Sequence, residues 1–160
     1  MSNKYITLES GVQSLKTAVT TSSANEIPSL DGSGKLSIDM MPAGLGPDVK
    51  SLTNTESTTV DAGKLVNITA TGFQLASAGS NRAVDGFVLA SVDAAAAGMV
   101  YLDGIITGLT GLTAGLRYYL GAAGAITATP NTASGETHQY VGKALSATEL
   151  AFEATDAIKL

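Results

Sequence analysis

The chain has 160 residues, of which 44% are hydrophobic and only 5% aromatic, and it contains 18 glycines, no tryptophan and no cysteine. The lack of cysteine excludes disulfides, thiolate zinc sites and cysteine nucleophiles. The formal net charge is -5 and the 9 Lys and Arg residues are scattered singly, which argues against nucleic acid as a partner because phosphate binding needs grouped basic side chains.

Residues 1–50 are predicted to form an extended N-terminal arm with short strands and Pro/Gly turns. Apolar alternations at 5–8 and 15–19 indicate the short strands. Pro28, Pro42 and Pro47 then lie among four glycines, and this mixture excludes a long helix. An extended segment with many apolar side chains is expected to lie along a surface, either that of a partner or that of its own domain. The candidate contact residues are Ile27, Leu30, Leu36, Ile38, Met40, Met41 and Leu45.

Residues 51–160 are predicted to form a mainly β domain, a compact β-barrel or β-sandwich of about eight short strands. Short apolar runs recur at intervals of about ten residues and are separated by turn residues. The expected strands cover residues 64–69, 73–76, 86–92, 99–106, 116–120, 125–128, 139–145 and 149–153. A core of small aliphatic residues is thin, so we expect the domain to gain buried area by associating with further copies.

Some segments of this domain carry more specific expectations. The run 86–92 is apolar enough for a central strand, and 99–106 is expected to be one strand with a bulge at Asp103 and Gly104. Residues 93–98 are good helix formers but too few for a helix that stands alone, so we expect a single turn. The repeat GLTGLT is expected to be a long connection between strands. Tyr118 and Tyr119 are neighbours in a strand, so one should pack inside while the other lies at a surface.

Residues that could carry chemistry are few. His138 could join a triad with Ser134, but no G-x-S-x-G motif is present, and a polar position at the start of a strand explains it better. The stretch DGSGK at 31–35 has neither the spacing of a phosphate loop nor the alternating carboxylates of a calcium loop, so it is predicted to be a glycine turn. Asp85 and Asp103 each precede a glycine and are expected to be turn or bulge residues. We therefore predict no catalytic, cofactor-binding or metal-binding residue and no enzymatic activity.

Two parts of the chain resemble bacteriophage capsid decoration proteins, also called cement or head-stabilising proteins. The first is IPSLDGSGKLSIDMMPAGLGPDVKSL at 27–52, where a Leu-Asp-x-x-Gly-Lys-Leu turn precedes a Met-Pro-x-Gly-x-Gly step. The second comprises AVDGFVLASVDAAAAGMVYLDG, GLTGLTAGLRYYLGAAGAITATP and QYVGKALSATELAFE, which are similar to the glycine-punctuated β-domain of those proteins. Similar runs occur in some tail-fibre and head-fibre proteins. The motifs are structural turns, so the resemblance concerns virion surface proteins as a class.

The resemblance implies a structural virion protein that binds the outer surface of the phage capsid at inter-capsomer positions and stabilises the expanded head. It implies a homotrimer with the major capsid protein as its partner, made in the host cytoplasm and located on the outer capsid surface. Extended arms that add strands to a neighbour would suit the predicted arm. The alternative is a tail-fibre or head-fibre module that binds a host-surface receptor. No cofactor is expected. Neither a membrane-spanning apolar run nor the apolar stretch of a signal peptide is present, so we expect no membrane partner and no Sec export.

Overall fold

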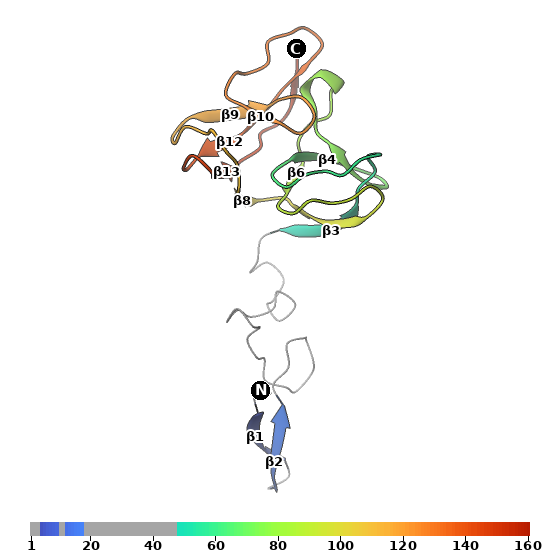
Figure 1. Cartoon of the computed structure of the whole chain (residues 1–160), viewed down its shortest axis with the longest axis vertical. Helices are drawn as coiled ribbons and strands as arrows, with labels where there is room; N and C mark the ends of the chain where they lie inside the picture. Colours follow the sequence, from blue (N-terminus) through green and yellow to red (C-terminus); the bar gives the residue numbers. More distant parts are fainter. Residues whose placement is uncertain (1–3, 10–11, 18–47) are drawn as a thin grey trace. The chain divides into compact units, whose positions relative to one another are not determined.

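The computed structural model describes residues 4–9, 12–17 and 48–160, and it builds them mainly from antiparallel strands (Figure 1). The chain divides between Gly46 and Pro47 into two units. In the first unit, β1 (Lys4–Glu9) and β2 (Val12–Thr17) pair as an antiparallel hairpin. The apolar alternation at 5–8 lies within β1, as expected of a strand.

The second unit, called the β-unit below, contains a first sheet with the strand order β3-β7-β6-β4-β5. Its strands are β3 (Val49–Thr53), β4 (Leu65–Thr69), β5 (Gly72–Leu75), β6 (Gly86–Val88) and β7 (Ala97–Tyr101). β6 is the central strand, as its apolar composition predicts. The two edges of this sheet approach each other, because Asn54 forms a parallel bridge to Phe73 and the Thr55 amide donates to the Phe73 carbonyl at 2.8 Å. A single bridge leaves the sheet open.

A second antiparallel sheet has the strand order β10-β9-β12-β13-β8. Its strands are β8 (Gly104–Ile106), β9 (Arg117–Leu120), β10 (Ile126–Thr127), β12 (Tyr140–Ala144) and β13 (Leu150–Phe152). A two-stranded ladder joins β11 (Thr137–His138) to β14 (Ile158–Lys159), and a short 3-10 helix, η2, covers Ala78–Ser80. The mainly β prediction is confirmed. The barrel alternative is wrong, because β8 and β10 remain unclosed edges of the second sheet and the first sheet is joined by one bridge alone.

The expected strand at 99–106 is in fact two strands that belong to different sheets. β7 ends at Tyr101 and pairs within the first sheet, whereas β8 begins at Gly104 and pairs with β13 in the second. Gly104 has φ +115°, a conformation that disfavours other residues, and this bends the chain from one sheet into the other. The Asp103 carboxylate fixes the bend by accepting a hydrogen bond from the Asp48 amide at 2.9 Å. The predicted bulge is therefore a crossover.

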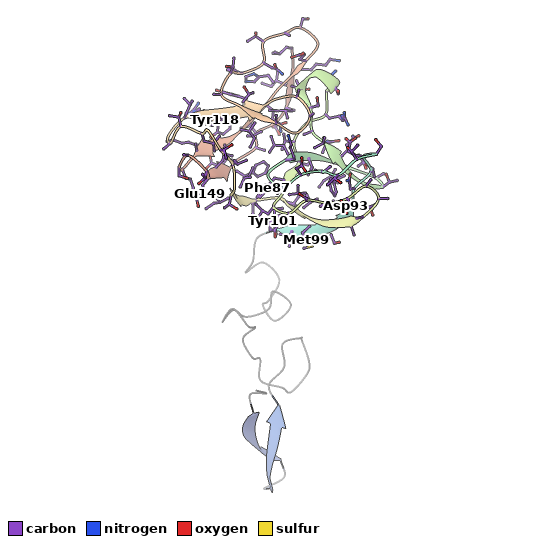
Figure 2. The ribbon with its side chains drawn as sticks, in the orientation of Figure 1. Phe87, Asp93, Met99, Tyr101, Tyr118 and Glu149 are labelled. Carbon is purple, nitrogen blue, oxygen red and sulfur yellow. The ribbon has the colours of Figure 1, made fainter. Side chains whose placement is uncertain are left out.

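One buried cluster, cluster 1, draws side chains from both sheets. It comprises Leu65, Ala76, Ala78, Val84, Phe87, Ile106, Tyr118, Leu120, Val141, Ala144, Leu150 and Phe152. The Phe87 ring stacks on Tyr101 with centroids 5.5 Å apart (Figure 2). It also meets the Phe152 ring edge-on with centroids 5.1 Å apart. Phe87 comes from the first sheet and Phe152 from the second. These rings therefore join the two sheets.

A separate buried cluster, cluster 2, lies on the other face of the first sheet. It comprises Val60, Val66, Phe73, Val88, Val92 and Val100. Neighbours along a strand point to opposite faces, so Phe87 enters cluster 1 while Val88 enters cluster 2. Val60 and Val92, which exchange backbone hydrogen bonds of 2.9 and 2.8 Å, cover this second face. The central strand β6 is thus buried on both faces, which explains why its residues are continuously apolar.

Two connections have the form that the sequence predicts. Residues 93–96 make a single turn, closed by the Ala96 amide donating to the Asp93 carbonyl at 3.1 Å, before the chain enters β7. The GLTGLT segment is a connection between β8 and β9. Its Leu109 and Leu112 pack against cluster 1 and donate their amides to the loop between β12 and β13.

Candidate functional site

The seven predicted contact residues of the arm lie outside the residues that the structure describes, as does the DGSGK stretch. They are Ile27, Leu30, Leu36, Ile38, Met40, Met41 and Leu45. Their role as a contact surface stays a prediction.

His138 lies in a strand, but as the second residue of the two-residue strand β11 rather than at the start of a strand. Its Nδ1 lies 3.1 Å from the Asn131 carbonyl oxygen. A carbonyl can only accept, so Nδ1 carries the proton and the other ring nitrogen, Nε2, is left for a further contact. The imidazole also lies 5.3 Å from the Tyr119 ring. His138 therefore belongs to a group of rings at the protein surface.

Asp85 and Asp103 hold loops, as their positions before glycines predict. The Asp85 carboxylate accepts hydrogen bonds from the Ile68 amide at 2.7 Å and from Asn67 Nδ2 at 2.9 Å. Asp103 fixes the crossover through the Asp48 amide. Within residues 48–160, no group of three or more His, Asp and Glu side chains is placed to hold a metal ion.

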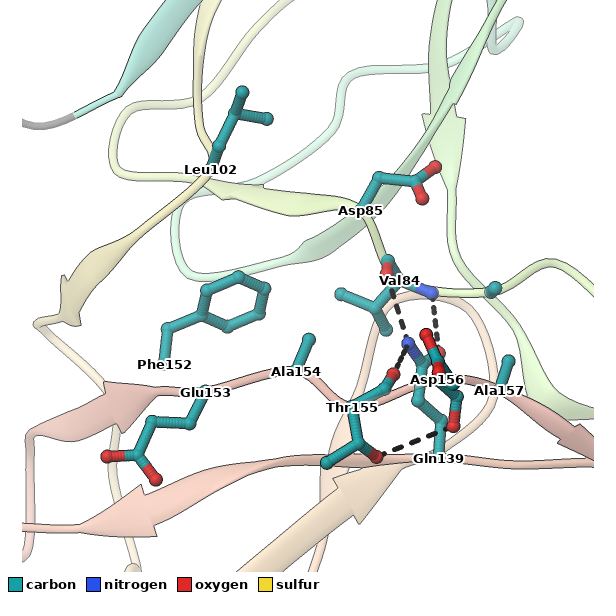
Figure 3. A pocket seen from close by; sticks show the side chains of 11 residues that line it. Val84, Asp85, Leu102, Gln139, Phe152, Glu153, Ala154, Thr155, Asp156 and Ala157 are labelled. Carbon is teal, nitrogen blue, oxygen red and sulfur yellow. Dashed lines mark hydrogen bonds between the residues drawn. The ribbon is translucent and has the colours of Figure 1, made fainter.

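A cavity of about 440 Å³ opens beside the C-terminal segment of the β-unit (Figure 3). Its lining consists of Ala83, Val84, Asp85, Leu102, Gln139, Phe152, Glu153, Ala154, Thr155, Asp156 and Ala157. Gln139 is only 3% exposed. Its side-chain amide donates to the carbonyls of Val84 (3.1 Å) and Thr155 (2.8 Å), while its Oε1 accepts from the Val84 amide at 2.7 Å. Both N–H groups of the Gln139 side chain thus bind backbone carbonyls. Gln139 acts as a clamp that joins the segment at Val84 to the segment at Thr155.

Replacing Gln139 with leucine is expected to lower the free energy of unfolding by about 2 kcal/mol, because it leaves the buried backbone N–H and carbonyl of Val84 without partners and removes the hydrogen bond to the Thr155 carbonyl. Gln74→Leu is the matched control, since Gln74 is half-buried and bonds to side chains that water can also reach. Urea unfolding followed by circular dichroism compares the two variants. Equal free energies of unfolding for the two variants would show that the Gln139 hydrogen bonds do not stabilise the fold.

The outer surface of the second sheet carries a group of polar and aromatic side chains that we call the tyrosine face. It comprises Arg117, Tyr119, His138, Tyr140, Lys143 and Glu153. Tyr118 points inward to cluster 1, so its neighbour Tyr119 points outward, as the alternation predicts. The rings of Tyr119 and Tyr140 meet edge-on with centroids 6.0 Å apart.

A β-bulge places Tyr140 on this face. Tyr118 pairs with Gly142 and Tyr119 with Tyr140, so one residue of β12, Val141, is extra. The Val141 side chain points into cluster 1. Gly142, the next residue, is also buried. Without the extra residue, the alternation would turn Tyr140 inward. The alternation in the sequence reveals Tyr119, but the bulge hides Tyr140, because its position depends on pairing between strands far apart in the chain.

Charged groups surround the two rings. The Arg117 guanidinium lies 5.8 Å from the centre of the Tyr140 ring, and the Tyr140 hydroxyl donates a long hydrogen bond of 3.5 Å to Glu153. Burial, and next the charge of Glu153, raise the pKa of Tyr140 above its usual value, whereas Arg117 acts in the opposite direction. The hydroxyl therefore stays protonated and remains a donor at neutral pH.

No protein-family model and no curated protein matches this sequence. In the part of the chain that the structure describes, no helix is long and apolar enough to cross a membrane.

Proposed function

We propose that this chain is a structural virion protein that binds the outer surface of a phage capsid at inter-capsomer positions, as a homotrimer, and stabilises the expanded head. The observation that carries the proposal is the division of the chain into two units at Gly46. All described members of clusters 1 and 2 lie between Val60 and Phe152. The β-unit thus builds a core of its own, which supports a separate role for the apolar residues at 27–45.

The proposed mechanism is binding linkage. A ligand that binds one conformation of a protein and not the other stabilises the first by its binding free energy. A chain that binds the expanded capsid lattice alone would stabilise that lattice in the same way, repeated at each site. The arm would supply the contact with the major capsid protein, and the β-unit would sit outside as a bracing body. No bond is made or broken in this mechanism.

Deleting residues 1–46 is expected to abolish capsid binding while leaving the β-unit folded. The measurement is co-sedimentation of the purified protein with capsids that lack it, alongside a circular dichroism spectrum of the truncated chain. In the full-length chain, Leu30→Ser combined with Leu36→Ser should weaken binding, whereas Leu145→Ser should not, because Leu145 is an exposed apolar residue of the β-unit. A truncated chain that folds and still binds capsids would contradict the arm's role.

The number of copies per particle separates a shell protein from a fibre component. Quantitative mass spectrometry of purified virions against the major capsid protein should give hundreds of copies, in a fixed ratio to capsid subunits. A handful of copies per virion would overturn the capsid proposal and favour a tail-fibre or head-fibre module.

A further inference from the structure

We propose that the tyrosine face is a binding site for an acidic sugar, a pyranose that carries a carboxylate. The inference is independent of the proposed capsid role, because it uses side chains of the second sheet and none from the arm. Few aromatic residues are present in the chain, and the sequence alone makes sugar binding an unfavoured use of Tyr118 and Tyr119. The structure changes this by bringing Tyr119, Tyr140 and His138 together on one face.

The first argument is the bulge at Val141. Burying a tyrosine ring is favourable, and an uninterrupted strand would direct Tyr140 towards the core. The bulge instead directs it outward, opposite Tyr119. Bulges that re-aim a side chain are frequent beside binding sites. Both rings are half-buried, so each keeps part of its surface open, and the apolar C–H groups of a pyranose can pack against an exposed aromatic ring.

The second argument is charge. Arg117 and Lys143 are direct cross-strand partners, and like charges in such positions destabilise a sheet. The ion pair described within residues 48–160 joins Arg82 to Glu56, so neither cation of the face has a carboxylate partner in that part of the chain. The face thus holds two cations against the single carboxylate of Glu153, in a chain whose net charge is -5. An anionic group bound between Arg117 and Lys143 would remove this repulsion.

The remaining polar groups suit sugar hydroxyls. Glu153 can accept hydrogen bonds, and the Nε2 of His138 can contact a sugar hydroxyl because Nδ1 already faces the Asn131 carbonyl. The Tyr119 hydroxyl can donate or accept. The two tyrosine rings offer an apolar surface to a pyranose, and the polar groups around them can form hydrogen bonds with its hydroxyls. The carboxylate of an acidic pyranose would bind the two cations.

A protein partner fits the face less well. Specific protein interfaces use about 20–30 residues a side, far more than the six of the tyrosine face. A second copy bound by two-fold symmetry would place the same patch on both sides, so Arg117 and Lys143 would face a surface with the same excess of positive charge. Self-association is therefore an outcome that the test must detect.

The test uses the full-length protein labelled with ¹⁵N and follows its amide resonances during titration. The probes are glucuronate, galacturonate and N-acetylneuraminate at millimolar concentrations, with glucose and galactose as neutral controls. We expect at least one acidic sugar to shift resonances of β9 and β12 in a saturable manner, to do so less strongly as salt is added, and to bind more tightly than the neutral sugars.

Variants test the charged group and the aromatic ring of the site separately. Arg117→Gln should weaken binding by about tenfold through loss of a charge-assisted hydrogen bond, and Tyr119→Ala should weaken it several-fold. Tyr119→Phe keeps the ring and should bind nearly as the parent does. Lys50→Gln is the matched charge control, because Lys50 is an exposed cation on β3 of the first sheet, and it should leave binding unchanged.

Three results would overturn the proposal. The first is the absence of saturable shifts with all three acidic sugars, and the second is shifts that map away from β9 and β12. The third is a set of shifts at the tyrosine face that depends on protein concentration without any sugar, which would assign the face to a second copy of the chain. Loss of sugar binding in Arg117→Gln with capsid binding intact would keep this site separate from the arm.

Discussion

Phe87→Ala is expected to destabilise the β-unit by about 3–5 kcal/mol, the cost of removing a large buried side chain from a packed core. Phe87 is fully buried in β6, where its ring stacks on Tyr101 and meets Phe152 from the opposite sheet. Its removal leaves a cavity where aromatic rings of the two sheets touch. A single domain is stable by only about 5–15 kcal/mol, so the β-unit would lose a large part of its stability.

Urea denaturation, followed by circular dichroism at several temperatures, measures the loss. Phe87→Leu keeps much of the volume and should cost about half as much. Met99→Ala is the control on the neighbouring strand β7, because Met99 is 45% exposed, and it should change stability by no more than about 0.5 kcal/mol. If Phe87→Ala were no more destabilising than Met99→Ala, the two sheets would not share one core.

The elements predicted best from the sequence are those in which local pattern and final environment agree. The strand at 64–69 follows a turn and alternates in the usual way, and β4 (Leu65–Thr69) occupies nearly the same residues. The outward position of Tyr119 follows from the inward position of Tyr118, because adjacent residues of a strand face opposite sides. Such inferences need no knowledge of which strands pair.

The elements that sequence reasoning missed depend on contacts between distant segments. The two residues of β14 form a strand only because they pair with β11, some twenty positions earlier, and neither segment has a pattern long enough to predict it. Within the run at 99–106, Asp103 and Gly104 indicate an irregularity, but the local pattern does not distinguish a bulge in one strand from the turn of the chain into another sheet at Gly104. Among the candidate site residues, Arg117 and Lys143 become neighbours only through the register of β9 and β12.

Gly142→Ala is expected to destabilise the β-unit by about 3 kcal/mol, the upper end of the range for overpacking a core. A Cβ at Gly142 would overlap the carbonyl oxygen of Ala151 in the paired strand β13 and would lie 2.5 Å from Leu150 Cδ2. The leucine can rotate, but the backbone carbonyl cannot, so β12 would have to move away from β13. The matched control is Gly79→Ala, because a Cβ there would meet its nearest neighbour at an ordinary 3.5 Å.

Gly142→Ala is also expected to disturb the tyrosine face, because Gly142 lies beside the β-bulge. Gly142 directly follows the bulge residue Val141, and it pairs with Tyr118 while Tyr140 pairs with Tyr119. Displacing β12 should therefore alter the tyrosine face as well as the core. We expect the amide resonances of Tyr119 and Tyr140 to shift in Gly142→Ala and to keep their positions in Gly79→Ala. Unchanged stability in Gly142→Ala would mean that β12 and β13 are less closely apposed than the structure indicates, and the bulge would then lose its role in placing Tyr140.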